Sequence, residues 1–237
     1  MVPLDIEALA KKHLIALGMW RLPVDPLAIV KEEGIEPAPG RYGDKFDARI
    51  KFVRLVKTFI LFYKEAGYGL TEGRVRFSIG HELGHYVLGH VAKGFAFFLA
   101  GLLLGLYVTF HALQWMLKRW GNGWGVRGQE DWAALAVLLM IMGVLAFVSM
   151  PIENGFSRMQ EHAADVYGLE VVHGLVANSQ EAGAHAFQVL GEADLADPKP
   201  SWFITFWLYS HPPQAERQEF AYRYDPWSKG EAPKYVK

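Results

Sequence analysis

The chain has 237 residues, a formal charge of −1, 51% hydrophobic residues and 21% charged residues. This composition excludes a disordered chain, a collagen and a coiled coil, and the near-neutral charge argues against a nucleic-acid partner. Because there is no cysteine, disulfides, iron–sulfur clusters and thiol nucleophiles are excluded, and any metal site must use histidine and carboxylate ligands.

The first 93 residues predict helices with a small sheet. They contain no apolar run typical of a signal peptide. In one short helix Asp25 is the expected N-cap, and Pro26 takes the first position, where proline is favoured. The predicted elements are a helix over 4–17, a helix within 23–34, a loop over 37–43, one or two strands within 49–63, and a helix over 75–92 with Ser78 as N-cap.

The last of these helices contains the motif His81-Glu82-x-x-His85. Positions four apart share one face of a helix, so the two imidazoles can bind one zinc ion. The intervening Glu82 can then act on a zinc-bound water. The alternative is a helix with a chance pair of histidines. His90 lies five residues further on and is interpreted as a helix-end residue, not as a third ligand.

Two uncharged segments predict a transmembrane hairpin. Residues 94–117 hold no charge in 24 positions, and residues 132–150 hold none in 19. As helices they span about 36 Å and about 28 Å, against a hydrocarbon core of about 30 Å. We expect Pro151 to close the second span, and Gly101 and Gly105 to let the helices approach closely. The alternative is a pair of buried helices in a soluble core. Four residues at one end predict an interfacial belt: Trp115, Trp120, Trp124 and Trp132.

Two spans place both flanking segments on one side of the membrane. Because no export signal precedes the hairpin, we expect that side to be the cytoplasm. The prediction is an integral protein of the bacterial inner membrane with its active site facing the cytoplasm. Its parts are an N-terminal half of the catalytic domain (1–93), the hairpin (94–150) and a C-terminal half (151–237).

A third ligand is predicted on a helix over 153–175. Glu161 follows His85 by 76 residues, and removal of the 57-residue hairpin leaves 19. This spacing is similar to that of thermolysin-like gluzincins, in which a second helix supplies a glutamate. Asp165 shares the face of Glu161 and can accept a hydrogen bond from a bound histidine, while Ala164 leaves room for close packing. The alternative is a solvated acidic helix face.

The order of these motifs is specific. After the hairpin come Ser157-Arg158, Glu161-x-x-Ala164-Asp165, His211-Pro212-Pro213 and Arg217. This order resembles the HtpX and CAAX-prenyl-protease family of integral-membrane gluzincins. The resemblance implies an α+β, mainly α fold: a zincin-like catalytic domain with a small sheet and an inserted two-helix transmembrane hairpin. Residues 1–90 also resemble ImmA/IrrE-type metalloproteases.

The resemblance also implies the roles of the site residues. His211, Arg217 and Arg158 are candidates to stabilise the transition state. The alternative for His211 is a loop histidine before a Pro-Pro turn, and for Arg158 a pairing with Glu161 or a backbone carbonyl. One zinc ion per chain would be held by His81, His85 and Glu161, with Glu82 as general base and acid and with Asp165 and Arg158 behind the ligands.

The predicted function is that of a membrane-anchored zinc endopeptidase in membrane protein quality control. Its expected partners are a protein or peptide substrate and the lipid bilayer. One alternative is an ImmA-like regulatory protease that cleaves a specific soluble regulator. The other is a non-catalytic metal-binding membrane scaffold, against which the intact Glu82 argues.

Residues 202–209 are apolar but too short to span a bilayer, and residues 231–237 are expected to be mobile.

Overall fold

The structure is a computed structural model that describes residues 26–40, 48–53, 58–64 and 72–236. The helix expected over 4–17 and the cap at Asp25 lie outside these residues. The described elements, in chain order, are α2 (Pro26–Glu32), β1 (Glu36–Gly40), β2 (Ala48–Val53), β3 (Thr58–Lys64), α3 (Glu72–Val87), α4 (His90–Trp124), α5 (Ala134–Val172), α6 (Ser179–Ala193), α7 (Trp202–Leu208) and α8 (Gln214–Arg223).

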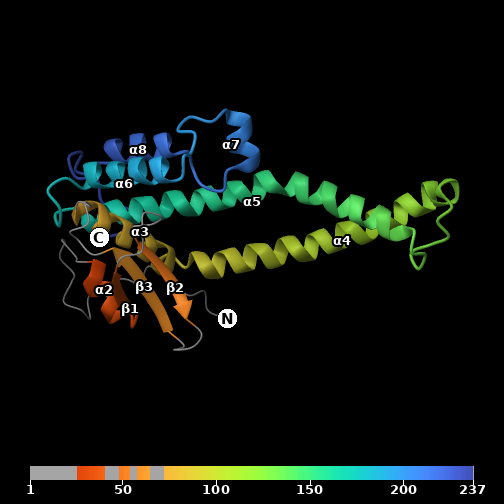
Figure 1. The fold of residues 1–237 in the computed structure, drawn as a ribbon, viewed down its shortest axis with the longest axis horizontal. Helices are drawn as coiled ribbons and strands as arrows, with labels where there is room; N and C mark the ends of the chain where they lie inside the picture. The colour runs from red at the N-terminus through yellow and green to blue at the C-terminus, as the bar shows by residue number, and fades with distance from the viewer. Residues whose placement is uncertain (1–25, 41–47, 54–57, 65–71, 237) are drawn as a thin grey trace.

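Helices α3 and α5 form a central layer between the sheet and helices α6 and α8 (Figure 1). On α3, Val75, Ile79 and Leu83 recur every fourth residue and pack in the core shared with the sheet. Phe77 of the same helix packs in a second core with Phe187 of α6. Helix α3 is therefore held from both sides, which makes it a rigid support for a site.

The sheet has the order β1-β3-β2, with β1 parallel and β2 antiparallel to β3. The prediction of strands within 49–63 is confirmed by β2 and β3. The loop predicted over 37–43 is wrong over its first residues, because Pro37 and Pro39 belong to β1 and pair in register with Leu61 and Tyr63. Proline is tolerated in β1 because this strand lies at an edge of the sheet.

The motif-bearing helix begins and ends earlier than predicted. Helix α3 starts at Glu72, so Ser78 is an interior residue, and its hydroxyl donates to the Arg74 carbonyl at 3.1 Å. The helix ends at Val87 because Gly89 adopts the left-handed conformation (φ 66°), in which glycine carries no steric cost. His90 then begins α4.

Helix α5 continues through Pro151, so the predicted helix end at this residue is wrong. Proline removes one backbone hydrogen bond and bends a helix, and α5 is bent in Figure 1, but the helix resumes beyond it. The helix predicted over 153–175 is the second half of α5. A single helix of 39 residues therefore carries both the apolar segment and Glu161.

Helices α4 and α5 project together away from the rest of the molecule (Figure 1). Both are long and apolar enough to cross a membrane, and only 0% and 11% of their most apolar windows are buried. Core helices of a soluble protein would be covered, so the exposure disfavours that alternative. The rings of Phe97 on α4 and Phe156 on α5 stack on each other, with their centroids 4.1 Å apart. A Cβ at Gly101 or Gly105 would meet no atom within 4 Å, so the close approach expected there is wrong.

Residues 234–236 are held in place, contrary to the expectation that residues 231–237 are mobile; residue 237 lies outside the described residues. The carboxylate of Glu170, which is fully buried, accepts backbone N–H bonds from Tyr235 at 2.7 Å and Val236 at 2.9 Å. It also accepts bonds from the Lys234 backbone and the Tyr224 hydroxyl. Val236 is buried in the core beside the sheet.

Candidate metal centre

Small residues let α3 and α5 meet at backbone distance. A Cβ at Gly84 would lie 3.2 Å from the Ala164 Cα and 3.1 Å from the Tyr167 Cβ. A Cβ at Gly168 would lie 3.1 Å from the backbone nitrogen of His81. The role predicted for Ala164 is thus matched by glycines on both helices. This crossing brings the histidine motif against Glu161.

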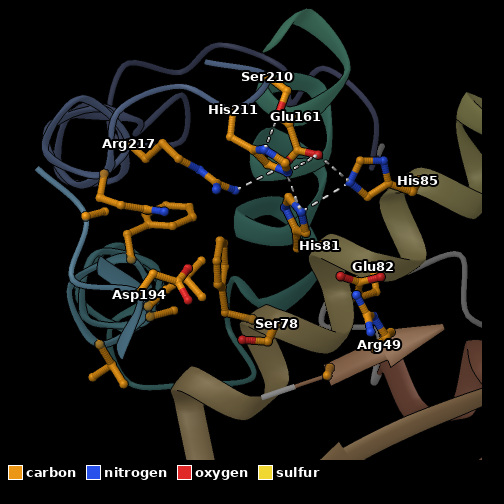
Figure 2. A pocket seen from close by; sticks show the side chains of 18 of the residues that line it. Arg49, Ser78, His81, Glu82, His85, Glu161, Asp194, Ser210, His211 and Arg217 are labelled. Atoms are coloured by element: carbon orange, nitrogen blue, oxygen red, sulfur yellow. Dashed lines mark hydrogen bonds and ion pairs between the residues drawn. The ribbon is translucent and has the colours of Figure 1, made fainter. Parts of the chain in front are cut away.

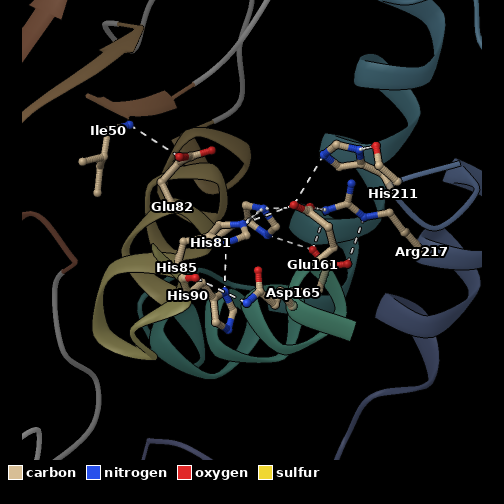
Figure 3. Close-up of polar contacts among 11 residues, drawn as sticks. Ile50, His81, Glu82, His85, His90, Glu161, Asp165, His211 and Arg217 are labelled. Carbon is tan, nitrogen blue, oxygen red and sulfur yellow. Dashed lines mark hydrogen bonds and ion pairs between the residues drawn. The ribbon is translucent and has the colours of Figure 1, made fainter. Parts of the chain in front are cut away.

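Three side chains converge at the crossing (Figure 3). The Nε2 atoms of His81 and His85 are 3.2 Å apart. Glu161 places Oε2 3.5 Å from the Nε2 of His81 and Oε1 3.4 Å from the Nε2 of His85. Ligand atoms bound tetrahedrally about 2.0–2.2 Å from zinc lie about 3.3 Å from one another, so these three residues fit a zinc ion.

Asp165 lies behind this trio and is fully buried. Its Oδ1 is 2.8 Å from the Nδ1 of His81, and its two oxygens accept bonds of 2.6 and 2.9 Å from Arg217. Burial alone would raise the pKa of Asp165, but the Arg217 guanidinium and His81 together outweigh it and lower that pKa. Asp165 is therefore ionised and can fix the ring of His81 with its Nε2 toward the site.

The environment sets the protonation of the three converging residues. Burial would lower the pKa of His81, but Asp165 and Glu161 outweigh it and raise that pKa to about 9. Burial and the neighbouring His81 lower the pKa of His85 to about 3. Burial would raise the pKa of Glu161, but His81 and Arg217 hold it well below its usual range. His85 is thus neutral and Glu161 ionised, the forms that bind metal, whereas His81 must release a proton.

Glu82 lies on the neighbouring face of α3, toward the sheet. Its Oε2 accepts a bond from the backbone N–H of Ile50 in β2 at 3.4 Å (Figure 3). Burial raises the pKa of Glu82. A carboxylate with a raised pKa takes up a proton more readily than an ordinary one, as a general base must.

His90 contacts the site, beyond its predicted place as a helix-end residue. It begins α4, as a helix-end residue would, but its Nδ1 lies 2.9 Å from the Nδ1 of His85 and its side chain is buried. Gln160 bonds its carbonyl at 3.4 Å. The sequence feature that indicates this contact is Gly89, because its left-handed backbone turns the chain so that His90 faces α3.

The remaining predicted residues come from the C-terminal part. His211 is exposed and places Nε2 3.4 Å from Glu161 Oε1, with its Nδ1 3.0 Å from the Ser210 hydroxyl. Arg217 is only 4% exposed, lies 4.3 Å over the Phe187 ring and reaches Glu161 Oε2 at 3.5 Å. Arg158 is separate from these residues. It donates to the backbone carbonyls of Thr205, at 3.0 Å, and Tyr209.

A cleft of about 700 Å³ is lined by six of the site residues (Figure 2): His81, Glu82, His85, Glu161, His211 and Arg217. Its walls come from β2, α3, α6 and the segment between α7 and α8. The cleft is open and its α6 wall is partly apolar, with Phe187 and Leu190 among the lining residues. A polypeptide could therefore reach Glu82 and Glu161 from solvent.

Known proteins resemble both the sequence and the fold. A model of the family described as Peptidase family M48 matches residues 49–224, which include the hairpin and every site residue above. A Bacillus subtilis (strain 168) protein, "Uncharacterized metalloprotease YhfN", is 34% identical over 152 residues, or 64% of this chain and 34% of that protein. The chain thus spans about a third of that relative's length. The crystal structure of S. mikatae Ste24p superposes with a TM-score of 0.59 at 14% identity, covering 91% of this chain and 55% of that one, which shows a similar fold.

Proposed function

Because the chain belongs to peptidase family M48, we propose that it is a zinc-dependent endopeptidase anchored in a membrane by α4 and α5. The observation that carries this proposal is the trio of His81, His85 and Glu161 at the floor of an open cleft, with Glu82 one residue from a ligand. We assign one zinc ion per chain to this trio. When bound, zinc supplies an acidified water molecule and a Lewis acid for the peptide carbonyl.

The residues of the chain divide the remaining work. Glu82 is positioned to take a proton and deliver it to the leaving amine, which its raised pKa supports. His211 is exposed on the cleft and is the better candidate to donate a hydrogen bond to the developing oxyanion. The bonds of Arg217 to Asp165 support a positioning role for this arginine. Those of Arg158 support a role in holding the segment that leads to His211.

Membrane anchoring is supported by the exposed apolar faces of α4 and α5 and by the tryptophans at the far end of the hairpin. We propose protein or peptide substrates and contact with lipid. The inner membrane, the cytoplasmic side and a role in quality control stay predictions from the sequence, as does the division into 1–93, 94–150 and 151–237.

The test is casein hydrolysis by the full chain purified in detergent, with zinc content measured on the same samples. Glu82→Gln keeps the shape of the side chain and removes the base, so we expect zinc near one per chain and hydrolysis reduced about 10²–10⁴-fold. Glu161→Gln should lose zinc as well as activity.

Two results would contradict the proposal. Absence of zinc from the wild-type chain would overturn the ligand assignment. Zinc without hydrolysis of casein would favour either a regulator-specific protease or a non-catalytic scaffold, and a panel of soluble regulators would then separate these two alternatives.

A further inference from the structure

Helix α7 exposes an apolar surface that the described residues leave uncovered. Its sequence is Trp-Phe-Ile-Thr-Phe-Trp-Leu, and none of its seven residues is buried. Trp202 is 77% exposed, Phe203 51% and Phe206 44%. A contiguous exposed patch of this kind marks a contact with another apolar phase or molecule.

Polar contacts hold α7 firmly despite this exposure. The Asn154 side chain donates to the Trp207 carbonyl at 2.6 Å, and Arg158 donates to the Thr205 carbonyl at 3.0 Å. Ser201 caps the helix start at 3.4 Å through the backbone N–H of Ile204. The patch is thus a built feature of the fold and not a loose segment.

The location of α7 along α5 points to what covers it. The Trp207 ring stacks on Phe147 at 4.3 Å, inside the uncharged part of α5, whereas Asn154 lies just beyond the first charged residue, Glu153. Helix α7 therefore contacts α5 where the apolar segment gives way to the charged one. A bilayer changes from hydrocarbon to headgroups at such a boundary.

Distances along α5 agree with a bilayer. From Ala134, beside the tryptophans at the hairpin tip, Phe147 is about 20 Å and Asn154 about 30 Å along the helix. The hydrocarbon core is about 30 Å thick, and aromatic residues gather at both of its surfaces. The tip tryptophans and α7 are therefore separated by about one bilayer thickness. Figure 1 shows α7 running across the direction of α5, as a helix lying in the membrane surface would.

We propose that α7 inserts its aromatic face into the interface of the bilayer from which α4 and α5 emerge. This inference rests on the membrane anchoring proposed above. Leu208 ends α7, and Tyr209, Ser210 and His211 follow it directly. All four residues line the cleft. Insertion of α7 would hold the cleft mouth at the membrane surface and favour polypeptide segments next to the bilayer as substrates.

The test uses single cysteines, since the natural chain has none. Trp202→Cys, Phe203→Cys and Phe206→Cys are each spin-labelled in the full chain, reconstituted in phosphatidylcholine vesicles. Accessibility is measured to oxygen, which enters lipid, and to a water-soluble nickel chelate. Leu139→Cys, in the exposed part of α5, is the control for lipid, and Tyr222→Cys, exposed on α8, is the control for water. Zinc content, unchanged from wild type, verifies folding.

We expect the α7 labels to be accessible to oxygen and to lose most of the nickel accessibility seen at Tyr222→Cys. Nickel accessibility equal to that of Tyr222→Cys, with Leu139→Cys protected, would overturn the inference and leave the anchoring intact. Protection from both reagents would mean that protein, such as a second copy, covers α7, which also overturns it. Nickel accessibility at Leu139→Cys would overturn the anchoring itself.

Discussion

The two halves of α5 have opposite surfaces, although they belong to one continuous helix. Between Ala134 and Met150 the helix exposes large apolar side chains such as Leu139 and Phe147. Between Glu161 and Val172 it buries the carboxylates of Glu161, Asp165 and Glu170. In a soluble helix, apolar residues face inward and charges face water.

This reversal shows that the halves serve different surroundings. The first half exposes apolar side chains, which the membrane anchoring proposed above would cover with hydrocarbon. The second half buries charge, which is tolerated only because each carboxylate has charged or hydrogen-bonding partners. Substitutions in the buried part of the molecule, each matched with one at an exposed position, test this contrast.

The largest expected effect is at Glu170. In Glu170→Ala the backbone donors of the C-terminal segment and the Tyr224 hydroxyl lose their acceptor. The free energy of unfolding should fall by about 3–6 kcal/mol, since each buried donor left unpaired costs about 1–3 kcal/mol. Glu153→Ala removes an exposed carboxylate of the same helix that accepts a bond from the Ser149 hydroxyl, and it should change the free energy of unfolding by less than about 0.5 kcal/mol. Denaturation in detergent measures the free energy of unfolding of both variants. Equal losses in the two variants would contradict the contrast between buried and exposed carboxylates.

A smaller effect is expected from adding one methyl group at a glycine. Gly84→Ala places a Cβ 3.2 Å from the Ala164 backbone, so α3 and α5 must separate. The free energy of unfolding should fall by about 1–3 kcal/mol. Zinc binding should weaken with it, because the ligands lie on the two separating helices. Gly101→Ala faces open space in the hairpin and should be neutral or stabilising by up to about 1 kcal/mol. If Gly84→Ala leaves the free energy of unfolding unchanged, the crossing of α3 and α5 accommodates an added methyl group more readily than its contacts indicate.

The smallest expected effect is at His90, which connects the hairpin to the site. Because its ring contacts the His85 imidazole, His90→Ala should weaken zinc binding about tenfold, at the low end for residues that orient ligands. His111→Ala, also on α4 but exposed and distant from the site, is the control and should bind zinc as the wild type does. Competition with a chelator measures both affinities. Unchanged affinity in His90→Ala would remove this residue from the site.

Local patterns anticipated much of the fold. The motif helix, the two strands within 49–63, the short helix beginning at Pro26 and the two apolar helices depend on periodicity, length and charge within one segment. The errors were at positions where neighbours override local preference. Pro151 suggested a helix end and Ser78 a helix start, but α5 continues through Pro151 and α3 begins six residues before Ser78.

The sequence by itself determined the ligand types, their order and the uncharged spans, since an i, i+4 histidine pair or an apolar run is complete within a few turns of helix. Only the tertiary structure decided which buried charges meet. Arg217, which pairs with Asp165, lies 52 residues from it along the chain. The groups that bond Glu170 lie more than 50 residues from it. No local period encodes such pairs. The same holds for α7, six of whose seven residues are apolar and would ordinarily indicate a buried core. Their exposure follows from where Phe147, Asn154 and Arg158 fasten the helix.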